Sequence, residues 1–182
     1  TQEPLIIRVN LSGKQFTPQL SAGVDQILQE TGLPPQCLKL EITESILMAN
    51  AESAITTLTD LRALGIRLAI DDFGTGYSSL SYLHRFPIDM LKIDRSFISK
   101  IDADGEQLAI VRTITTLAWN LGMEVVAEGV ETSKQLAQLK ALQCEYAQGY
   151  FFCRPLDREA ATQFLAETLL GKTVNGRLSP LQ

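Results

Sequence analysis

The chain has 182 residues, of which 45% are hydrophobic, and it carries a formal net charge of −5. This length and hydrophobic content predict one folded domain and exclude an intrinsically disordered chain. The negative charge excludes a general nucleic-acid surface, so neither DNA nor RNA is expected as a partner.

The cysteines and the hydrophobic runs both indicate an intracellular setting. Cys37, Cys144 and Cys153 are odd in number and lack the spacing of a zinc site, so we expect buried apolar residues in a reducing compartment. No run approaches the ~18 apolar residues of a membrane span, and residues 1–4 lack the features of a signal peptide. We therefore expect a cytoplasmic protein, or the cytoplasmic domain of a larger one, that makes no membrane contact.

Six short segments of the sequence are predicted to be β-strands. They cover residues 5–11, 38–43, 68–72, 90–94, 124–130 and 146–152. In the first of them, alternate aliphatic residues share one face, while Ile6, Arg8 and Asn10 share the other. This alternation is typical of a strand with one apolar side.

Apolar residues at helical spacing follow each of these strands. The predicted helices begin near residues 18, 54, 78, 105, 133 and 158. Thr17 before Pro18, the capping box Thr132-Ser-Lys-Gln135 and Asp157 are the signals for three of the starts. Residues 172–182 have little apolar periodicity and are predicted to be a tail that follows a domain of residues 1–171.

The third strand runs into two consecutive carboxylates, Asp71 and Asp72, and then into a glycine-rich turn. Adjacent side chains on a strand point to opposite faces, so both carboxylates can reach one site only if the strand ends there and the backbone turns. Gly74 and Gly76 permit such a turn. The stretch predicts a metal-binding loop, and the alternative is a cap for a helix that begins near Ser78.

The alternation of strands and helices predicts an α/β fold with a parallel sheet. A doubly wound sheet should be apolar on both faces, whereas five of these strands carry polar residues toward their carboxyl ends. These residues are Asn10, Glu41, Lys92, Glu128 and Gln148. The pattern favours a TIM-type (β/α)8 barrel, whose active site forms where those ends converge. Six β/α units are two too few, so we expect the N-terminal strands to be missing and residues 5–11 to form an exposed sheet edge.

Each polar residue also has an ordinary structural explanation. Lys92 and Asp94 could be an ion pair on a solvated strand, Glu128 could face a helix dipole, and Gln148 could belong to a turn. Polar groups in register on five strand ends nevertheless favour a catalytic or ligand site. His84, the only histidine, follows a helix and indicates a surface or packing role instead.

Six motifs near the strand ends form a specific combination. They are Asn10-Leu-Ser12, Glu41-Ile-Thr-Glu44, Asp71-Asp-Phe-Gly-Thr-Gly-Tyr-Ser-Ser-Leu80, Leu91-Lys-Ile-Asp-Arg-Ser-Phe97, Val126-Ala-Glu-Gly-Val-Glu131 and Gln148-Gly-Tyr-Phe-Phe152. Together, from about Ile7 to Pro155, they resemble the EAL-domain phosphodiesterases. The resemblance implies a modified TIM barrel with an antiparallel first strand. It also implies hydrolysis of the bacterial second messenger cyclic di-GMP to linear pGpG, with Mg²⁺ or Mn²⁺ as two ions per site.

The resemblance further implies roles for the polar residues at the strand ends. Asn10, Glu41 and Asp71 would bind one metal ion, and Asp72 would help to bind the second. Glu128 would be a metal ligand or the general base, and Lys92 would position or activate the attacking water. The Glu-Ala-Leu motif that names the family, whose glutamate is another metal ligand, is absent from the sequence, as is the arginine that follows it.

Other residues match supporting positions of the family. Gln148, Asp94 and Pro155 would lie at the substrate. Glu44 would hold the loop that contains Phe73, Gly74 and Thr75, and Glu131 would support the site. The resemblance also implies a homodimer, and fusion to sensor or GGDEF-type domains in the parent protein.

The charges of the proposed ligands agree with a metal-dependent reaction. Four carboxylates around a dianionic substrate would repel it without cations, and oxygen ligands without Cys or His indicate Mg²⁺ or Mn²⁺ rather than zinc. Two such ions can polarise the phosphoryl oxygens, while Lys92 adds positive charge where the transition state gains negative charge. Substitution of Lys92 or Glu128 is expected to slow turnover by about 10² and to leave the melting temperature nearly unchanged.

Two other classes of function fit parts of the pattern. A cyclic di-GMP receptor or interaction module would have lost metal ligands, yet every ligand within the retained span is present, which favours an enzyme. A different metal-dependent barrel enzyme, similar to enolase, needs a further base on a late strand. Only Glu128 and Gln148 are available for that role.

Overall fold

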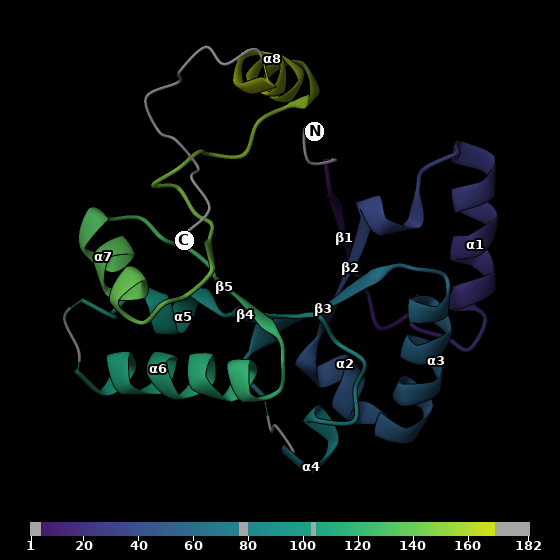
Figure 1. Cartoon of the computed structure of the whole chain (residues 1–182), viewed down its shortest axis with the longest axis horizontal. Helices are drawn as coiled ribbons and strands as arrows, with labels where there is room; N and C mark the ends of the chain where they lie inside the picture. The colour runs from purple at the N-terminus through teal and green to yellow at the C-terminus, as the bar shows by residue number, and fades with distance from the viewer. Residues whose placement is uncertain (1–4, 77–79, 103–104, 170–182) are drawn as a thin grey trace.

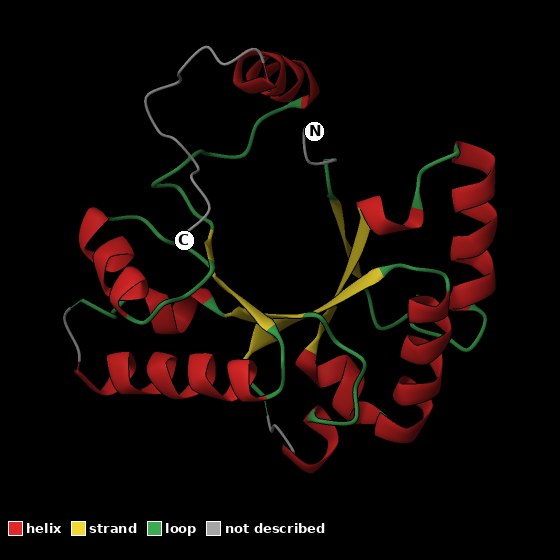
Figure 2. Cartoon of the chain, in the orientation of Figure 1, coloured by secondary structure: helices red, strands yellow, loops and turns green. Residues whose placement is uncertain are grey.

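The computed structural model describes residues 5–76, 80–102 and 105–169, which form a curved sheet with helices on its outer side (Figures 1 and 2). The strands are β1 (Ile7–Leu11), β2 (Leu38–Thr43), β3 (Arg67–Phe73), β4 (Met90–Ile93), β5 (Glu124–Ala127) and β6 (Tyr146–Ala147). The predicted tail, residues 172–182, and the helix start at Ser78 lie outside the described residues.

The six strands are all parallel and lie in the sheet in their chain order, β1 to β6. Because the strands follow their chain order, every crossover helix lies on the same face of the sheet, and the sheet curls toward a barrel. In a doubly wound sheet the order of the strands would reverse at one point. The predicted barrel-type α/β fold is therefore confirmed. Within the described part of the chain the sheet remains open, because β1 pairs only with β2 and β6 only with β5.

The helices between successive strands cover the convex face of the sheet, whereas the last helix lies across its open, concave side (Figure 1). The helices are α1 (Leu20–Thr31), the 3₁₀ helix η1 (Pro35–Cys37), α2 (Glu44–Ala49), α3 (Ala51–Ala63), α4 (Leu80–Leu83), α5 (Arg95–Ile98), α6 (Gly105–Asn120), α7 (Ser133–Ala141) and α8 (Arg158–Leu169). Neither α2 nor α5 was predicted, because six and four residues are too few to show a helical period.

The helix caps test the predicted start signals individually. The capping box of Thr132 and Gln135 is present at α7, and Asp157 Oδ1 accepts from Ala160 N at 2.9 Å at the start of α8. The N-cap prediction for Thr17 is wrong, because α1 begins at Leu20 and its first turn has no side-chain cap. Thr17 instead lies in a preceding turn, where its carbonyl oxygen accepts from Leu20 N.

The hydrophobic core lies between the sheet and the helices. Outward-facing residues of the central strands, such as Ile42, Ile70 and Leu91, are fully buried in this layer. A smaller cluster of Ala69, Met90 and Val126 faces the concave side, below the polar strand ends. Aliphatic packing thus covers the outer face, and the inner face is left for the site.

The first strand is an exposed edge, as predicted. The side chains of Ile7 and Val9 are 50% and 41% exposed, although Leu11 on the same face is buried. One side of β1 has no strand partner in the described sheet. An exposed, aliphatic edge of this kind favours association with another chain segment.

Glycines end β5 and β6 earlier than predicted. Gly129 has a φ of 72°, and a Cβ on Gly149 would lie 2.2 Å from the carbonyl oxygen of Val130. Val130 N nevertheless donates to Gln148 O at 3.0 Å, so the two segments cross closely after the strands end. This crossing places Glu128 beside Gln148.

Two of the three cysteine predictions are correct. Cys37 and Cys144 are buried, whereas Cys153 is exposed on the loop before α8, and all three thiols are free. Burial raises the pKa of Cys144 to about 12, which keeps this thiol protonated. Among the described residues, no helix combines the length and hydrophobicity needed to cross a membrane.

Candidate functional site

Lys92 is the centre of a buried ionic cluster at the carboxyl ends of the strands. Its Nζ lies 2.5 Å from Glu41 Oε2, 2.8 Å from Asp71 Oδ1 and 2.7 Å from Glu128 Oε1. The side chains of Lys92 and Glu41 are 4% and 5% exposed. Residues from β2, β3, β4 and the end of β5 therefore converge on one ammonium group, as the barrel prediction requires.

The cluster shifts the pKa values of its members in ways that follow from burial and charge. Burial opposes the charged form of Lys92, but hydrogen bonds to Asp71, Glu128 and Glu41 outweigh it, and the pKa of Lys92 is raised. Burial raises the pKa of Glu128, and the hydrogen bond from Lys92 opposes this increase. Lys92 is therefore the charged group that allows several carboxylates to remain close together.

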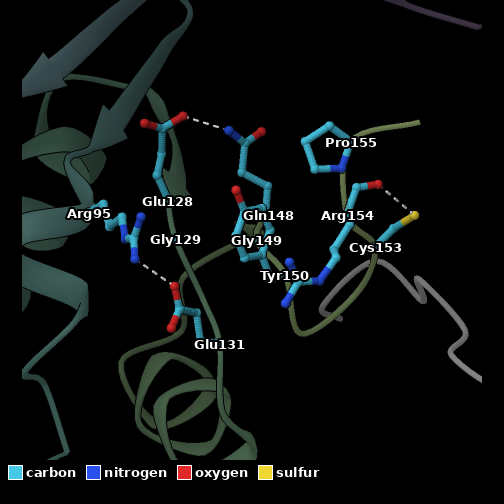
Figure 3. A pocket seen from close by; sticks show the side chains of 10 residues that line it. All are labelled: Arg95, Glu128, Gly129, Glu131, Gln148, Gly149, Tyr150, Cys153, Arg154 and Pro155. Carbon is cyan, nitrogen blue, oxygen red and sulfur yellow. Dashed lines mark hydrogen bonds and ion pairs between the residues drawn. The ribbon is translucent and has the colours of Figure 1, made fainter. Parts of the chain in front are cut away.

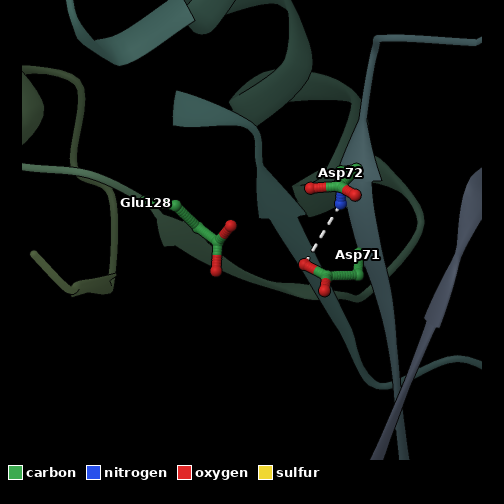
Figure 4. A group of neighbouring side chains, drawn as sticks. All are labelled: Asp71, Asp72 and Glu128. Atoms are coloured by element: carbon green, nitrogen blue, oxygen red, sulfur yellow. Dashed lines mark hydrogen bonds between the residues drawn. The ribbon is translucent and has the colours of Figure 1, made fainter. Parts of the chain in front are cut away.

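The predicted strand end at the two adjacent aspartates is wrong, because β3 continues to Phe73, but the backbone does depart from regular strand geometry between Ile70 and Phe73. Asp72 itself adopts a left-handed conformation with a φ of 52°, and Thr75 Oγ1 donates to its carbonyl oxygen at 2.8 Å. As a result, one carboxylate oxygen each of Asp71, Asp72 and Glu128 lies within 4.8 Å of the others (Figure 4). Burial raises the pKa of Asp72, the charge of Asp71 adds to this effect, and the charge of Lys92 acts against it.

Contacts from two directions hold the loop after β3. Glu44 Oε2, almost completely buried, accepts from Gly74 N at 3.1 Å. Phe73 is buried in the core, and Phe97 lies so close to Gly74 that a Cβ there would be 2.9 Å from its ring. The loop that positions Asp72 is therefore fixed by a hydrogen bond on one side and by an aromatic ring on the other.

Asn10 and Glu41 occupy paired positions on β1 and β2, so their side chains project from the same face of the sheet. Glu41 Oε1 is buried and accepts no hydrogen bond among the described residues, and Arg8 Nε lies 3.9 Å from it. A buried carboxylate oxygen without a donor is suited to a cation. Together with the oxygens of Asp71, Asp72 and Glu128, this donor set fits a hard divalent metal ion.

Two of the supporting residues are held in local structure. Asp94 caps α5, where its Oδ1 accepts from Ser96 N at 2.9 Å, and its charge also acts on Asp72. Glu131 forms an exposed ion pair with Arg95 at 2.7 Å. His84 is exposed on the turn after α4, as predicted.

A cavity of about 400 Å³ opens beside the carboxylates (Figure 3). Its lining includes Glu128, Gln148 and Pro155, together with Arg95, Glu131, Tyr150, Cys153 and Arg154. Gln148 Nε2 donates to Glu128 Oε1 at 2.6 Å, so the wall of the cavity is joined directly to the ionic cluster. Arg154 stacks over the ring of Tyr150 at 5.0 Å.

Sequence reasoning missed four residues near the site: Arg8, Arg95, Tyr150 and Arg154. Arg8 could have been found, because it precedes Asn10 by two residues on the same strand face. Tyr150 and Arg154 follow the close crossing of Gly149 and Val130, which strand alternation alone does not predict. Arg95 begins α5, a four-residue helix too short to be predicted.

Comparison with known proteins assigns the chain to a family. The model of the EAL domain matches residues 1–155. This chain belongs to the EAL domain family. Two similar proteins come from Pseudomonas aeruginosa. The cyclic di-GMP phosphodiesterase NbdA is 50% identical over 145 residues, covering 78% of this chain and 18% of NbdA. The bifunctional diguanylate cyclase/cyclic di-GMP phosphodiesterase MucR is 45% identical over 154 residues, covering 84% of this chain and 22% of MucR.

Solved structures of EAL domains have the same fold. The MucR phosphodiesterase in complex with c-di-GMP superposes with a TM-score of 0.83 at 44% identity, covering 86% of this EAL domain and 64% of that chain. The manganese and cyclic di-GMP complex of Klebsiella pneumoniae BlrP1 gives a TM-score of 0.76 at 35% identity, covering 82% and 39%. The EAL domain described here spans about a fifth of the length of the curated relatives it matches.

Proposed function

We propose that this EAL domain is a cyclic-guanylate-specific phosphodiesterase that hydrolyses cyclic di-GMP to linear pGpG. The observation that carries the proposal is the convergence of Glu41, Asp71, Asp72 and Glu128 around Lys92, beside a cavity of ligand size. Relatives named as cyclic di-GMP phosphodiesterases and a neighbour solved with this dinucleotide support the choice of substrate.

We assign two Mg²⁺ or Mn²⁺ ions to the carboxylate cluster. Asn10, Glu41 and Asp71 would hold one ion, and Asp72 and Glu128 would complete the second position. The oxygen-only donor set and the buried oxygen of Glu41 support this assignment. When bound, such ions supply Lewis-acid activation of the phosphoryl group and neutralise its charge.

The remaining residues would have different roles in the reaction. Lys92 Nζ would orient the attacking water and stabilise the negative charge that develops on the phosphoryl oxygens. Glu128 would accept the proton of that water. Gln148, Asp94 and Pro155 would hold the substrate. Glu44, Phe73, Gly74, Thr75 and Glu131 would keep the loop and the pocket in place.

Hydrolysis is tested with the natural polypeptide that contains these 182 residues. We expect it to convert cyclic di-GMP to pGpG in the presence of Mg²⁺ or Mn²⁺, and we expect Ca²⁺ to inhibit it, because Ca²⁺ prefers longer bonds and looser geometry. Chromatography of the product is the measurement. Binding of cyclic di-GMP without turnover in either metal would instead assign the domain to the receptors.

We also propose that the domain forms a homodimer and that, in the 182-residue chain, the aliphatic edge at β1 takes part in self-association. Ile7→Lys and Val9→Lys should weaken self-association of the 182-residue chain, raising its dissociation constant by about tenfold or more, because a charge on an edge strand opposes pairing. Analytical ultracentrifugation measures this effect. Ile27→Lys on α1, another exposed aliphatic position, is the matched control. Equal effects of all three substitutions would contradict a role for β1.

The setting of the domain in its parent protein is a further proposal. We propose that residues 1–171 form the EAL domain, that 172–182 are a tail, and that the domain works in the bacterial cytoplasm. Fusion to sensor or GGDEF-type domains is supported by MucR, a relative that is named as both a cyclase and a phosphodiesterase.

A further inference from the structure

A closed ring of polar contacts crosses the open side of the sheet. Arg8 Nη1 donates to Gln148 Oε1 at 3.4 Å, and Gln148 Nε2 donates to Glu128 Oε1 at 2.6 Å. The ring continues from Glu128 to Lys92 at 2.7 Å, from Lys92 to Glu41 at 2.5 Å, and from Glu41 back to Arg8 at 3.9 Å. Arg8 is the member of this ring that the proposed function leaves without a role.

The contacts of Gln148 require one orientation of its side-chain amide. Arg8 is only a donor and must face the amide oxygen, whereas the Glu128 carboxylate is only an acceptor and must face the amide nitrogen. Both conditions are met in the structure. If Arg8 were removed, the amide oxygen of Gln148 would lose its donor, and only the Glu128 carboxylate would still hold the amide. Arg8 therefore holds Gln148 from the side opposite Glu128 and keeps its amide nitrogen in place beside the carboxylate.

The ring also joins the two ends of the described sheet. Arg8 lies on β1, which pairs only with β2, and Gln148 follows β6, which pairs only with β5. The two residues are 140 positions apart in the chain. The side chain of Arg8 is 35% exposed, so a solvated surface charge is the competing explanation for this residue.

We infer that Arg8 is a positioning residue for the hydrolysis of cyclic di-GMP, which acts through Gln148 to hold the Glu128 carboxylate toward Lys92. The inference rests on the proposed function and adds a residue to it. Glu128 Oε1 receives contacts from both Lys92 and Gln148, so a less firmly held Gln148 leaves this carboxylate fixed from the Lys92 side alone. Outer-shell hydrogen bonds of this kind typically change activity or metal affinity by about 10- to 100-fold.

A double-mutant cycle tests the inference in the natural polypeptide. Arg8→Met should lower kcat about tenfold and change KM by less than about twofold, because the substrate pocket itself keeps its lining. Gln148→Met should lower kcat at least as much. The double variant should be no slower than Gln148→Met alone, since Arg8 acts only through the amide. The inference would be overturned if the two substitutions lowered kcat independently, so that their fold-losses multiplied in the double variant. An unaltered kcat in Arg8→Met would also overturn it.

Two further measurements separate positioning from folding and from the proposed reaction. Arg112→Met on α6 removes an exposed arginine away from the site and should leave kcat unaltered. Thermal unfolding should be nearly the same for Arg8→Met and the parent, and a large loss of melting temperature would overturn the positioning role. Calorimetric titration with Mn²⁺ gives a readout without turnover. In this titration, Arg8→Met should bind Mn²⁺ about tenfold more weakly than the parent does. Adding Arg8→Met to Gln148→Met should cause no further loss of Mn²⁺ affinity.

The two hypotheses fail in different ways. If the parent shows no turnover of cyclic di-GMP, the proposed function is wrong, and the Mn²⁺ cycle still decides whether Arg8 and Gln148 act together on Glu128. If the parent is active and neither cycle shows coupling, the proposed function stands and the inference about Arg8 is wrong.

Discussion

Replacement of Lys92 with methionine is expected to lower turnover by at least about 10² and also to lower the free energy of unfolding by about 3 kcal/mol in the absence of metal. The second effect differs from the expectation based on sequence, in which Lys92 serves catalysis alone. In the structure its ammonium is the shared partner of Glu41, Asp71 and Glu128, and all four side chains are at most 15% exposed. Removal of the cation leaves three crowded carboxylates.

The stability loss in Lys92→Met should depend on pH with a definite sign. Burial already raises the pKa of Glu128 above its ordinary value of 4.5, and loss of the Lys92 hydrogen bond removes the main opposing influence. A carboxylate whose pKa is higher in the folded than in the unfolded state does not lower stability when the pH is below its unfolded-state pKa. It lowers the free energy of unfolding increasingly as the pH rises through its folded-state pKa. The deficit should therefore be large at pH 7 and should shrink as the pH falls toward 4.5.

Chemical denaturation of Lys92→Met and its parent at several pH values measures this effect. Lys134→Met on α7 is the matched control, because it removes an exposed lysine. Addition of Mn²⁺ should recover part of the lost stability, since a bound cation replaces the missing positive charge. A variant as stable as its parent at pH 7 without metal would contradict the structural role assigned to Lys92.

Glu128→Gln is expected to lower turnover by at least about 10² while the free energy of unfolding changes by less than about 1 kcal/mol. The substitution removes the group that would accept a proton and bind metal. It preserves shape and an oxygen that can still accept from Lys92 and Gln148, both of which contact Glu128 Oε1. Because burial raises the pKa of Glu128, a neutral side chain is tolerated at this position.

Steady-state kinetics and thermal unfolding of Glu128→Gln provide the test, with Glu159→Gln on α8 as an exposed control. The contrast with Lys92→Met is informative, because one variant should lose activity alone and the other should lose activity and stability. A strongly destabilised Glu128→Gln would show that this carboxylate serves mainly to neutralise Lys92.

Much of the site could be predicted from the sequence because its residues follow strand alternation. Asn10, Glu41, Lys92 and Glu128 stand at the carboxyl ends of predicted strands, and parallel strands bring such ends to one edge of a sheet. A break in regular strand geometry at Asp71 and Asp72 was also predictable, because two neighbouring carboxylates on a regular strand point to opposite faces. In the structure the left-handed backbone at Asp72 provides that break.

What the sequence by itself determined is therefore the alternation of strands and helices, the barrel-type sheet and the polar residues at its carboxyl edge. Each of these follows from local periodicity. The tertiary structure alone decided that Lys92 neutralises three carboxylates, that Gly149 crosses Val130 so closely that β6 ends, and that Arg8 reaches Gln148. These features depend on distances between segments up to 140 residues apart. Such distances are set by the curvature and packing of the whole sheet, which no local pattern of residues specifies.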